Sequence, residues 1–440
     1  MRIWLAVAIT TVCLFFVQMT KLHNSFPPRK EYNPPTENRS AKNEQLNYSQ
    51  APTIAYAVSV TACSKEQVLM DGAAILRHSI HLNSIQNPAS KSKYNYQMIA
   101  IIHPQAMSCI ASEFEALGYQ VYERDTPVKV SEIQGDFLRE KVESNGCCGE
   151  KEFIKLWSLS FIDFPVVVHL DLDTVVFRPM DGLFDAMLHP SPAQKLNIPE
   201  SRWKLDEGSI QPMWTDHDVP NDIQAYFTRD YNMANPNLKY RHVGVQGGFF
   251  IVKPDLEQFE EYKSIIRIGD YTEHAGWGGK HYGPFYGAMT FQGILPYYYD
   301  ELHPNTAVEL NRCFYNAMGD NPRVNPTKNN VVSGLCRDGR EDCEDCREMH
   351  VDQVVTAHFT LCQKPWLCIG HDQDLLQHRL CRKMHEKWFE IRADLEGGEG
   401  NGKHDVAQFS GFCKGPGKRG YIPLNLGKIP SHKLENALKQ

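Results

Sequence analysis

The chain has 440 residues, of which 42% are hydrophobic, and a formal net charge of −7 at pH 7. This length and apolar content are enough for a large domain with its own core, which excludes a wholly disordered chain. The lack of a basic excess argues against a nucleic-acid-binding protein. A phosphate-bearing ligand would therefore need a metal ion or a few local cations.

The N-terminus begins with an uncharged apolar run over residues 3–19. This run is short for a transmembrane helix and slightly long for the apolar part of a cleaved signal peptide. Because no small-residue cleavage site follows it, we expect a signal anchor over 1–19 rather than a cleaved signal.

Residues 20–51 are rich in proline and polar residues, and we expect them to form a disordered stem. The stem carries two acceptor sequences for N-glycosylation, at Asn38 and Asn47. Together with the anchor, these features predict a type II protein of the Golgi or another secretory-pathway membrane, with the folded part in the lumen.

Of the 13 cysteines, all but Cys13 follow the stem, and seven of them lie within 336–413. In an oxidising compartment this crowding indicates disulfides, with the pairing left open. The alternative is a zinc site formed by Cys343, Cys346 and His350, which the lack of a second well-spaced pair disfavours.

From residue 53 the hydrophobic pattern alternates between strands and helices. We expect strands over 54–61, 96–102, 119–122 and 165–170, and helices over 67–82, 108–117 and 150–161. This order is typical of an α/β fold with a mainly parallel sheet and helices on both faces. We place this folded domain over 52–395 and expect a flexible, cysteine-containing tail over 396–440.

A further helix is expected over 181–187 and a further strand over 243–252. Between them lies a long polar segment, 191–241, with four large aromatic residues: Trp203, Trp214, Tyr226 and Tyr231. These aromatics suit stacking on sugar rings, although an ordinary insertion packed by its own aromatics would contain them too.

Two carboxylates, Asp171 and Asp173, stand directly after the apolar strand 165–170. Positions i and i+2 of an extended chain share one face, so the two charges repel each other unless a cation or a shared proton joins them. Ligands of open α/β sheets bind at this end of the strands, and hard cations bridge carboxylates to phosphates. The pattern predicts a metal site for a phosphate-bearing substrate, the alternative being two solvated carboxylates.

Three further motifs accompany the two carboxylates. Phe153-Ile-Lys155-Leu-Trp157 precedes the strand, the run Thr-Val-Val-Phe-Arg-Pro-Met-Asp-Gly-Leu-Phe follows at 174–184, and His358-Phe-Thr is followed by Lys364-Pro-Trp366. Together they resemble the family 8 glycosyltransferases, the glycogenin-like group, over roughly residues 53–370. The resemblance implies a Rossmann-like, glycosyltransferase type A-like sheet. It also implies transfer of a sugar from a UDP-sugar to a glycan, protein or lipid acceptor with retention of anomeric configuration.

The same resemblance assigns site residues by position. It implies that Asp171, Asp173 and His358 hold Mn²⁺, for which carboxylate and imidazole are suitable ligands. Lys155 and Lys364 would contact the diphosphate or the sugar, and Lys155 and Gln292 would act in catalysis. The nucleotide and sugar would be lined by Thr61, Leu172, Gln246, Gly247 and Gly248.

The chain also departs from the family pattern. Phe291 precedes Gln292 where the family has an aspartate, Gln246 replaces an asparagine, and Leu361 replaces a glycine. The missing aspartate leaves the sugar and any catalytic nucleophile undefined. The alternatives are another metal enzyme of phosphates, such as a nucleotidyltransferase or phosphatase, and a degenerate protein that binds a nucleotide sugar or glycan without turnover.

Overall fold

The computed structural model describes residues 51–63, 67–189, 220, 222–233, 242–323, 336–337, 343–369, 379–397, 405–407, 409–415 and 418–429. All of them belong to a unit that spans Tyr48–Gln440. No helix among these residues is long and apolar enough to span a bilayer. The expected anchor over 1–19 lies outside the described residues, as do the stem up to residue 50, Trp203 and Trp214.

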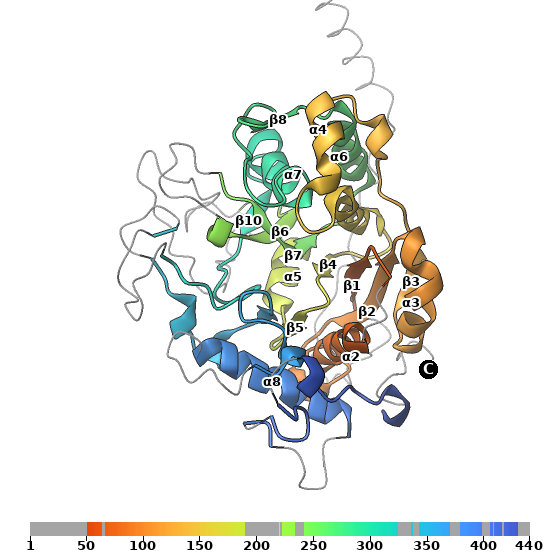
Figure 1. The fold of residues 1–440 in the computed structure, drawn as a ribbon, viewed down its shortest axis with the longest axis vertical. Helices are drawn as coiled ribbons and strands as arrows, with labels where there is room; N and C mark the ends of the chain where they lie inside the picture. The colour runs from red at the N-terminus through yellow and green to blue at the C-terminus, as the bar shows by residue number, and fades with distance from the viewer. Residues whose placement is uncertain are drawn as a thin grey trace, which may run out of the picture. The chain divides into compact units, whose positions relative to one another are not determined.

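A central sheet runs through the described part of the chain, with seven strands in the order β10-β6-β7-β4-β1-β2-β3 (Figure 1). The strands are β1 (Thr53–Val60), β2 (Asn95–Ile102), β3 (Gln120–Glu123), β4 (Val167–Leu170), β6 (Ala225–Arg229), β7 (Val245–Val252) and β10 (Ala307–Glu309). Strand β1 is parallel to β2 and β4, β2 to β3, and β6 to β10, whereas β7 is antiparallel to β4 and β6. The predicted mainly parallel sheet is confirmed, and the reversed strand β7 is an addition that the sequence pattern did not indicate.

The helices of the described residues are α2 (Gln67–Leu82), α3 (Pro104–Ala116), α4 (Asp136–Lys141), α5 (Asp181–Leu188), α6 (Leu256–Ile268), α7 (Phe291–Tyr297) and α8 (Arg379–Leu395). Helix α3 begins four residues before the expected start because the His103 side chain caps it and Pro104 occupies its first position. The helix expected over 150–161 is a 3-10 helix, η5 (Gly149–Ser160).

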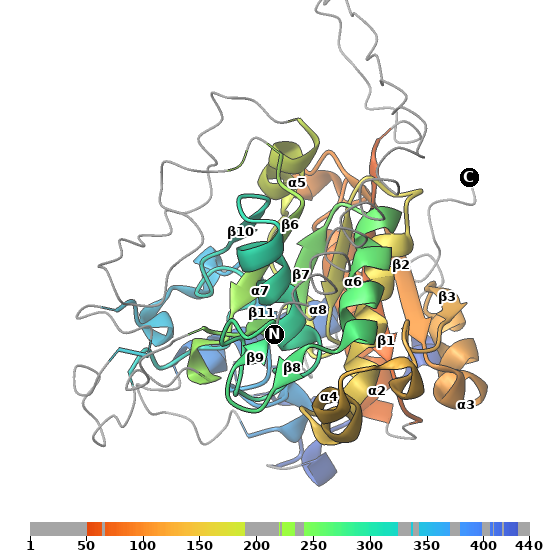
Figure 2. The same ribbon diagram turned by 90° about the horizontal axis from the view of Figure 1, so that it is seen from above.

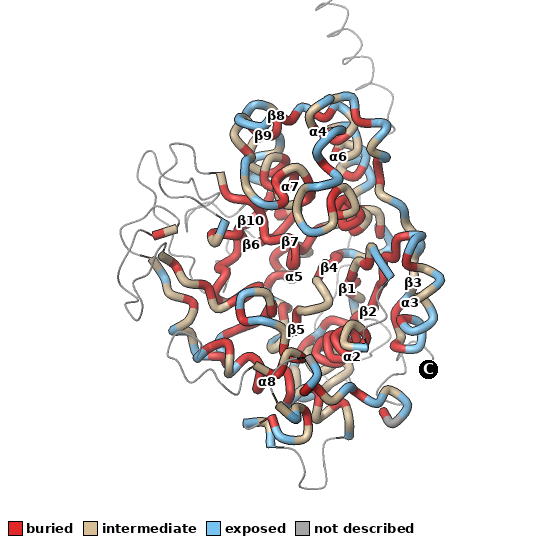
Figure 3. Tube along the Cα trace, in the orientation of Figure 1, coloured by how far each residue is buried: buried red, intermediate tan, exposed pale blue. Residues whose placement is uncertain are grey.

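The sheet is covered on both faces by helices that contribute to two separate hydrophobic clusters. Along β1, Tyr56 and Val58 belong to one cluster and Ala55 and Ala57 to the other, as expected from the alternation of side chains along a strand. Helices α2, α3, α5 and α8 pack into the first cluster, and α4, α6, α7 and η5 into the second (Figures 1 and 3). Figure 2 shows α6 and α7 over the strands, where α7 packs on β7 and α6 on η5.

The segment 191–241 contains β6, which the sequence did not predict, in addition to the residues that are not described. Two of its aromatics, Tyr226 and Tyr231, are buried at 0% and 3% exposure. Their hydroxyls bond to the Leu183 carbonyl and to Glu309 within the fold. Of the two interpretations left open for these aromatics, packing within the fold holds for Tyr226 and Tyr231, because buried rings cannot stack on a sugar.

A small second sheet joins two distant parts of the chain. It pairs β5 (Thr174–Val176) with β11 (Thr356–His358), antiparallel, with His358 opposite Thr174. A two-stranded pair, β8 (Tyr271–Thr272) with β9 (Gly276–Trp277), lies elsewhere in the unit. In the main sheet, β2 and β4 flank β1 on opposite sides, so the strand order reverses there. Open α/β sheets bind ligands at such a reversal, beyond the carboxyl ends of the strands.

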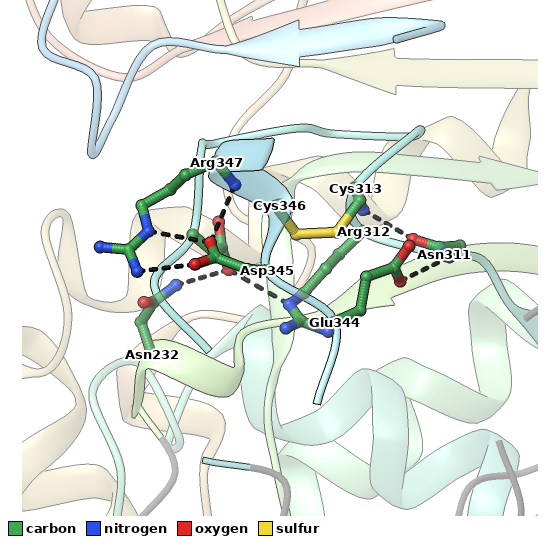
Figure 4. Close-up of a disulfide and its surroundings, with 9 residues drawn as sticks. Asn232, Asn311, Arg312, Cys313, Glu344, Asp345, Cys346 and Arg347 are labelled. Atoms are coloured by element: carbon green, nitrogen blue, oxygen red, sulfur yellow. Dashed lines mark hydrogen bonds and ion pairs between the residues drawn. A yellow bond between two sulfur atoms is a disulfide. The ribbon is translucent and has the colours of Figure 1, made fainter. Parts of the chain in front are cut away.

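Ten of the described cysteines form five disulfides: Cys63–Cys109, Cys313–Cys346, Cys336–Cys343, Cys362–Cys381 and Cys368–Cys413. The alternative zinc site is thereby excluded, since both of its cysteines are bonded to other cysteines. Figure 4 shows Cys313–Cys346 beside an ion pair of Arg347 with Asp345 and a hydrogen bond from Asn311 to Glu344.

The described part of the segment 396–440 is packed on the domain, which differs from the flexible tail that we expected. Phe412 and Tyr421 are buried in the first hydrophobic cluster, and Cys413 is bonded to Cys368. The glycines and lysines of this segment suggested mobility, but its apolar residues cover α8 and α2 instead.

Candidate metal centre

The two sequence-predicted carboxylates lie in a tight turn between β4 and β5. The Asp171 amide donates to the Gly248 carbonyl at 3.0 Å, which continues the pairing of β4 with β7 by one residue. The Thr174 amide and hydroxyl both donate to the Asp171 carbonyl, at 3.1 and 2.6 Å. These bonds close the turn, so the side chains of Asp171 and Asp173 are held at the reversal of the sheet.

His358 reaches this turn through the small second sheet. The Phe359 amide donates to the Asp173 carbonyl at 2.9 Å, and His358 Nε2 lies 3.3 Å from Asp173 Oδ1. One ligand-type atom from each of Asp171, Asp173 and His358 lies within 4.8 Å of the others. We call these three residues the aspartate cluster.

The orientation of His358 is fixed by Asn316 behind it. The Asn316 amide nitrogen donates to Thr228 at 2.9 Å and to Gln246 at 3.2 Å, so its oxygen faces His358 Nδ1 at 3.0 Å. His358 therefore donates from Nδ1, which leaves the lone pair of Nε2 toward the carboxylates. Metal-binding histidines in proteins are usually held through the second ring nitrogen in this way. Burial lowers the pKa of His358, an effect that Asp171 partly opposes, so the ring is neutral at neutral pH.

Lys155 places a buried cation against the aspartate cluster. Its ammonium group donates to Asp171 at 3.0 Å and to the Gly247 carbonyl at 2.9 Å, and lies 3.1 Å from Glu152. Side chains three residues apart are eclipsed in a 3-10 helix, which aligns Glu152 with Lys155. Burial alone would lower the pKa of Lys155, but Asp171 and Glu152 outweigh it and raise the pKa, so the group stays charged.

Lys364 forms an ion pair with Asp173 from the other side. Its side chain is 33% exposed, and burial lowers its pKa. Each carboxylate of the turn therefore has a lysine partner, one buried and one accessible. The accessible lysine is suited to exchange the carboxylate for an incoming anion.

Two consecutive glycines of β7 allow the surrounding side chains to come close. A Cβ atom on Gly248 would lie 2.3 Å from His358 Cε1 and 2.9 Å from Asp171 Oδ2, so no larger residue fits there. A Cβ atom on Gly247 would lie 3.4 Å from both Gln292 Cγ and the Lys155 ammonium. Gln292 thus lies beside Lys155, and its amide donates to the Tyr286 carbonyl.

The remaining sequence-predicted residues lie next to this set. Gln246 accepts from the Gly248 amide at 2.7 Å. The Leu172 carbonyl, in the turn itself, lies 2.8 Å from where a Cβ atom on Gly72 would stand. Thr61 follows β1, and its side chain helps to lower the pKa of Cys148. The predicted residues thus come from η5, β7, α7, β11 and the segments that directly follow β1, β4 and β11.

Sequence reasoning missed three residues of this region. Glu152 had a usable signal, since it precedes Lys155 by three positions on one helix. Asn316 had none, because it is 42 residues from His358 and lies in an irregular segment. Asp230 follows the unpredicted strand β6. Burial, together with the charge of Asp320, raises the pKa of Asp230 to about 6, and its charge acts on His358.

The donor set of the aspartate cluster fits a divalent cation. Two carboxylates from the turn after β4 and a neutral imidazole from β11 converge, and Asn316 holds the imidazole in the tautomer that binding requires. A second cluster of ligand-type atoms consists of Cys147, Cys148 and Glu152, which we call the thiol cluster. It is joined to the first through Glu152 and Lys155.

Comparison with known proteins gives a likeness of the backbone. No protein-family model and no curated protein matches the chain. The apo form of mouse xyloside xylosyltransferase 1 is 12% identical, with a TM-score of 0.40, and covers 70% of this chain and 97% of that one. The galactosyltransferase LgtC, solved with donor and acceptor sugar analogues, is 11% identical, with a TM-score of 0.37, and covers 77% and 94%. The apo glycosyltransferase GlyE of Streptococcus pneumoniae TIGR4 is 11% identical, with a TM-score of 0.38, and covers 78% and 60%. None of these values assigns a function.

Proposed function

We propose that this protein is a metal-dependent glycosyltransferase that transfers a sugar from a UDP-sugar to a glycan, protein or lipid acceptor, with retention of anomeric configuration. The observation that carries this proposal is the meeting of the aspartate cluster with Lys155 and Lys364 at the reversal of the sheet. A cation site with added positive charge suits a nucleotide diphosphate, and open α/β sheets bind ligands at such a reversal. The resemblance of the sequence motifs to family 8 glycosyltransferases is the reason for proposing a sugar as the transferred group.

In this proposal the aspartate cluster holds Mn²⁺, which when bound neutralises the diphosphate and makes UDP a better leaving group. Lys364 leaves Asp173 and pairs with the diphosphate, since it is the accessible cation of the site. Lys155 stays between Asp171 and the Gly247 carbonyl, where it fixes the turn and faces the sugar. Gln292 orients the sugar beside Gly247.

Phe291 is fully buried, so the position that carries an acid in the family contributes only to the core here. Among the described residues, Asp230 is a second buried carboxylate whose charge reaches His358. Its raised pKa is typical of a carboxyl group that can exchange a proton near neutral pH. We propose that Asp230 helps to position the residues of the site. We assign no nucleophile to the reaction.

The proposal is tested by a donor screen. The chain from residue 52 onward is incubated with Mn²⁺ and a panel of UDP-sugars, and release of UDP is measured with and without acceptor glycans. Release with one or a few donors is expected. Binding of UDP and Mn²⁺ without release from any donor would favour the degenerate binding protein, and release of phosphate or pyrophosphate would favour a phosphatase or nucleotidyltransferase.

We further propose that the chain works in the lumen of the Golgi or another secretory-pathway compartment, held by the anchor over 1–19. The five disulfides of the described residues support an oxidising compartment. Glycans at Asn38 or Asn47 on a membrane-bound product are the expected result. A cytosolic product without glycans would contradict this location.

A further inference from the structure

Two adjacent cysteines lie at the start of η5 in a turn that is next to the candidate site. Cys147 and Cys148 are free thiols, whereas the other described cysteines are all in disulfides. Their sulfur atoms are 2.9 Å apart, which is hydrogen-bonding contact and longer than the roughly 2.0 Å of a disulfide bond. Cys147 is exposed and Cys148 half-buried, so a redox partner can reach the pair.

We propose that Cys147 and Cys148 form a reversible vicinal disulfide, which makes this turn a redox-responsive modification site. Adjacent Cα atoms are about 3.8 Å apart, less than the 4.4 Å lower end of the usual disulfide range. The ring that such a bond closes is therefore strained, and strained, exposed disulfides are the ones most readily reduced. The bond would thus be the labile one among the disulfides of the described chain.

The turn has the backbone freedom that such a ring needs. Gly146 and Gly149 flank the pair with φ values of +69° and +60°, in the left-handed region that glycine adopts at little cost. The Gly149 amide donates to the Asn145 carbonyl at 3.0 Å and closes the turn. Because both flanking residues are glycines, the backbone on either side of the two cysteines can adopt dihedral angles that other residues would resist.

The neighbouring groups give the two thiols different roles. The Cys147 thiol donates to Glu152 at 3.0 Å and also contacts Cys148. The contact with Cys147 lowers the pKa of Cys148, whereas the same contact, burial and the charge of Glu152 raise the pKa of Cys147. Cys148 is therefore the attacking sulfur, since the thiolate is the nucleophile. Cys147, which the hydrogen bond to Glu152 keeps protonated, is the resolving one.

The oxidant is a disulfide, either glutathione disulfide or the active-site disulfide of an oxidoreductase. The Cys148 thiolate attacks one sulfur of the oxidant, forms a mixed disulfide and expels one thiolate. Cys147 then loses its proton to solvent and attacks the Cys148 sulfur, which expels the second thiolate. Two thiols of the chain are oxidised to one disulfide, and the oxidant takes up two electrons and leaves as two thiols.

Oxidation of the two thiols changes the hydrogen-bond partners of Glu152, which pairs with Lys155 of the candidate site. In the thiol form Glu152 accepts from Cys147 with one oxygen and pairs with Lys155 through the other. In the disulfide form no S–H remains, so Lys155 is the charged partner that Glu152 keeps. Formation of the disulfide itself is independent of sugar transfer and is tested without any activity measurement.

The test is a peptide map of the full-length chain, purified without reductant and treated with iodoacetamide. Trypsin cleavage after Lys141 and Lys151 releases residues 142–151, which contain both cysteines and no other. We expect this peptide unalkylated and lighter than the dithiol by two hydrogen atoms. After mild reduction we expect two alkyl groups on it, while the five other disulfides stay intact and serve as internal controls.

Two results would overturn the proposal: alkylation of both cysteines before any reduction, or a bond that resists reduction until the other five open. The role of Glu152 is tested by reoxidation of the reduced chain with glutathione disulfide. Glu152→Gln removes a charge that raises the pKa of Cys147, so a larger fraction of this thiol is ionised and closure should become faster, by about tenfold. Glu150→Gln, on the same helix, should close at the wild-type rate; equal rates in the two variants would remove Glu152 from the step.

Discussion

The aspartate cluster and the thiol cluster each bring three ligand-type atoms within 4.8 Å, yet they are built in opposite ways. The first collects its residues from β11 and the turn after β4, with Asn316 behind the imidazole. The second takes all three of its residues from a single turn and the helix that follows it.

This difference indicates which kind of chemistry each cluster can support. Residues held by separate strands keep their spacing when a ligand leaves, so the aspartate cluster is a preorganised site. Residues in one glycine-flanked turn can change their geometry locally, so the thiol cluster suits a chemical change in the residues themselves. The same count of ligand-type atoms therefore indicates a cation site in one place and a redox site in the other.

The largest expected effect is that of Asp173→Asn. It removes one charged ligand and the partner of Lys364, so turnover in the donor screen should fall by more than about 100-fold. The fold should persist, because the substitution also relieves the repulsion between two carboxylates. Asp163→Asn, the same change at an exposed position, is the control. Full activity of Asp173→Asn, or of the wild type in excess EDTA, would contradict a cation site at the aspartate cluster. The proposed difference between the two clusters would then be wrong.

Asn316→Ala tests the support behind the cation site. It leaves His358 Nδ1 without its acceptor and no longer fixes the tautomer, so the Mn²⁺ concentration for half-maximal activity should rise about 10- to 100-fold. Asn311→Ala removes another buried asparagine, one that bonds Glu344 away from the site, and should leave this Mn²⁺ requirement unchanged. Equal shifts in both variants would mean a general loss of stability in place of a specific role.

Gly248→Ala tests how tightly the aspartate cluster is packed. The added Cβ atom would lie 2.3 Å from His358 Cε1, so we expect a loss of about 1–3 kcal/mol in unfolding free energy and weaker Mn²⁺ binding by about tenfold. Gly182→Ala, where no atom lies within 4 Å of the added Cβ, is the matched control and should be neutral or stabilising. Thermal unfolding with and without Mn²⁺ measures both effects, and equal melting curves for the two variants would contradict the tight packing.

The smallest effect is expected at the thiol cluster. The double substitution Cys147→Ser and Cys148→Ser should change unfolding free energy by less than about 0.5 kcal/mol, as at most surface sites, and leave the Mn²⁺ requirement unchanged. A disulfide between neighbours closes a very short loop and adds little entropic stabilisation. A strong rise in the Mn²⁺ requirement of this variant would show that the two clusters act as one site.

The sequence predicted the parts of the fold that rest on local pattern. The range of α2 was predicted to the residue, and β1, β2 and β4 within about two residues, because each has a regular apolar period or an unbroken apolar run. Strand β6 was missed because it lies within a largely polar segment. The reversal of β7 depends on the path of the chain between strands and leaves no periodic signal.

For the site, the two carboxylates after an apolar strand predicted a metal site, and the family resemblance added His358 and both lysines; the structure brings these residues together. The positions of Asn316 and Asp230 at the site could not be predicted. Asn316 lies in a long irregular segment, and Asp230 follows a strand that the sequence did not predict. Zinc remained open as an alternative because Cys343 and Cys346 have a ligand-like spacing, whereas their disulfide partners lie 7 and 33 residues away in the chain.

The segment around residues 421–424 supplies hydrogen-bond partners to a buried residue of α2. Asp71 of α2 is fully buried, and its carboxylate accepts from the Tyr421 hydroxyl and the Leu424 amide, both at 2.8 Å, across 350 and 353 positions. A chain still emerging from the ribosome therefore carries a charged group in this helix whose native partners have not yet been made. This part of the native core can therefore be completed only after residue 424 has been synthesised.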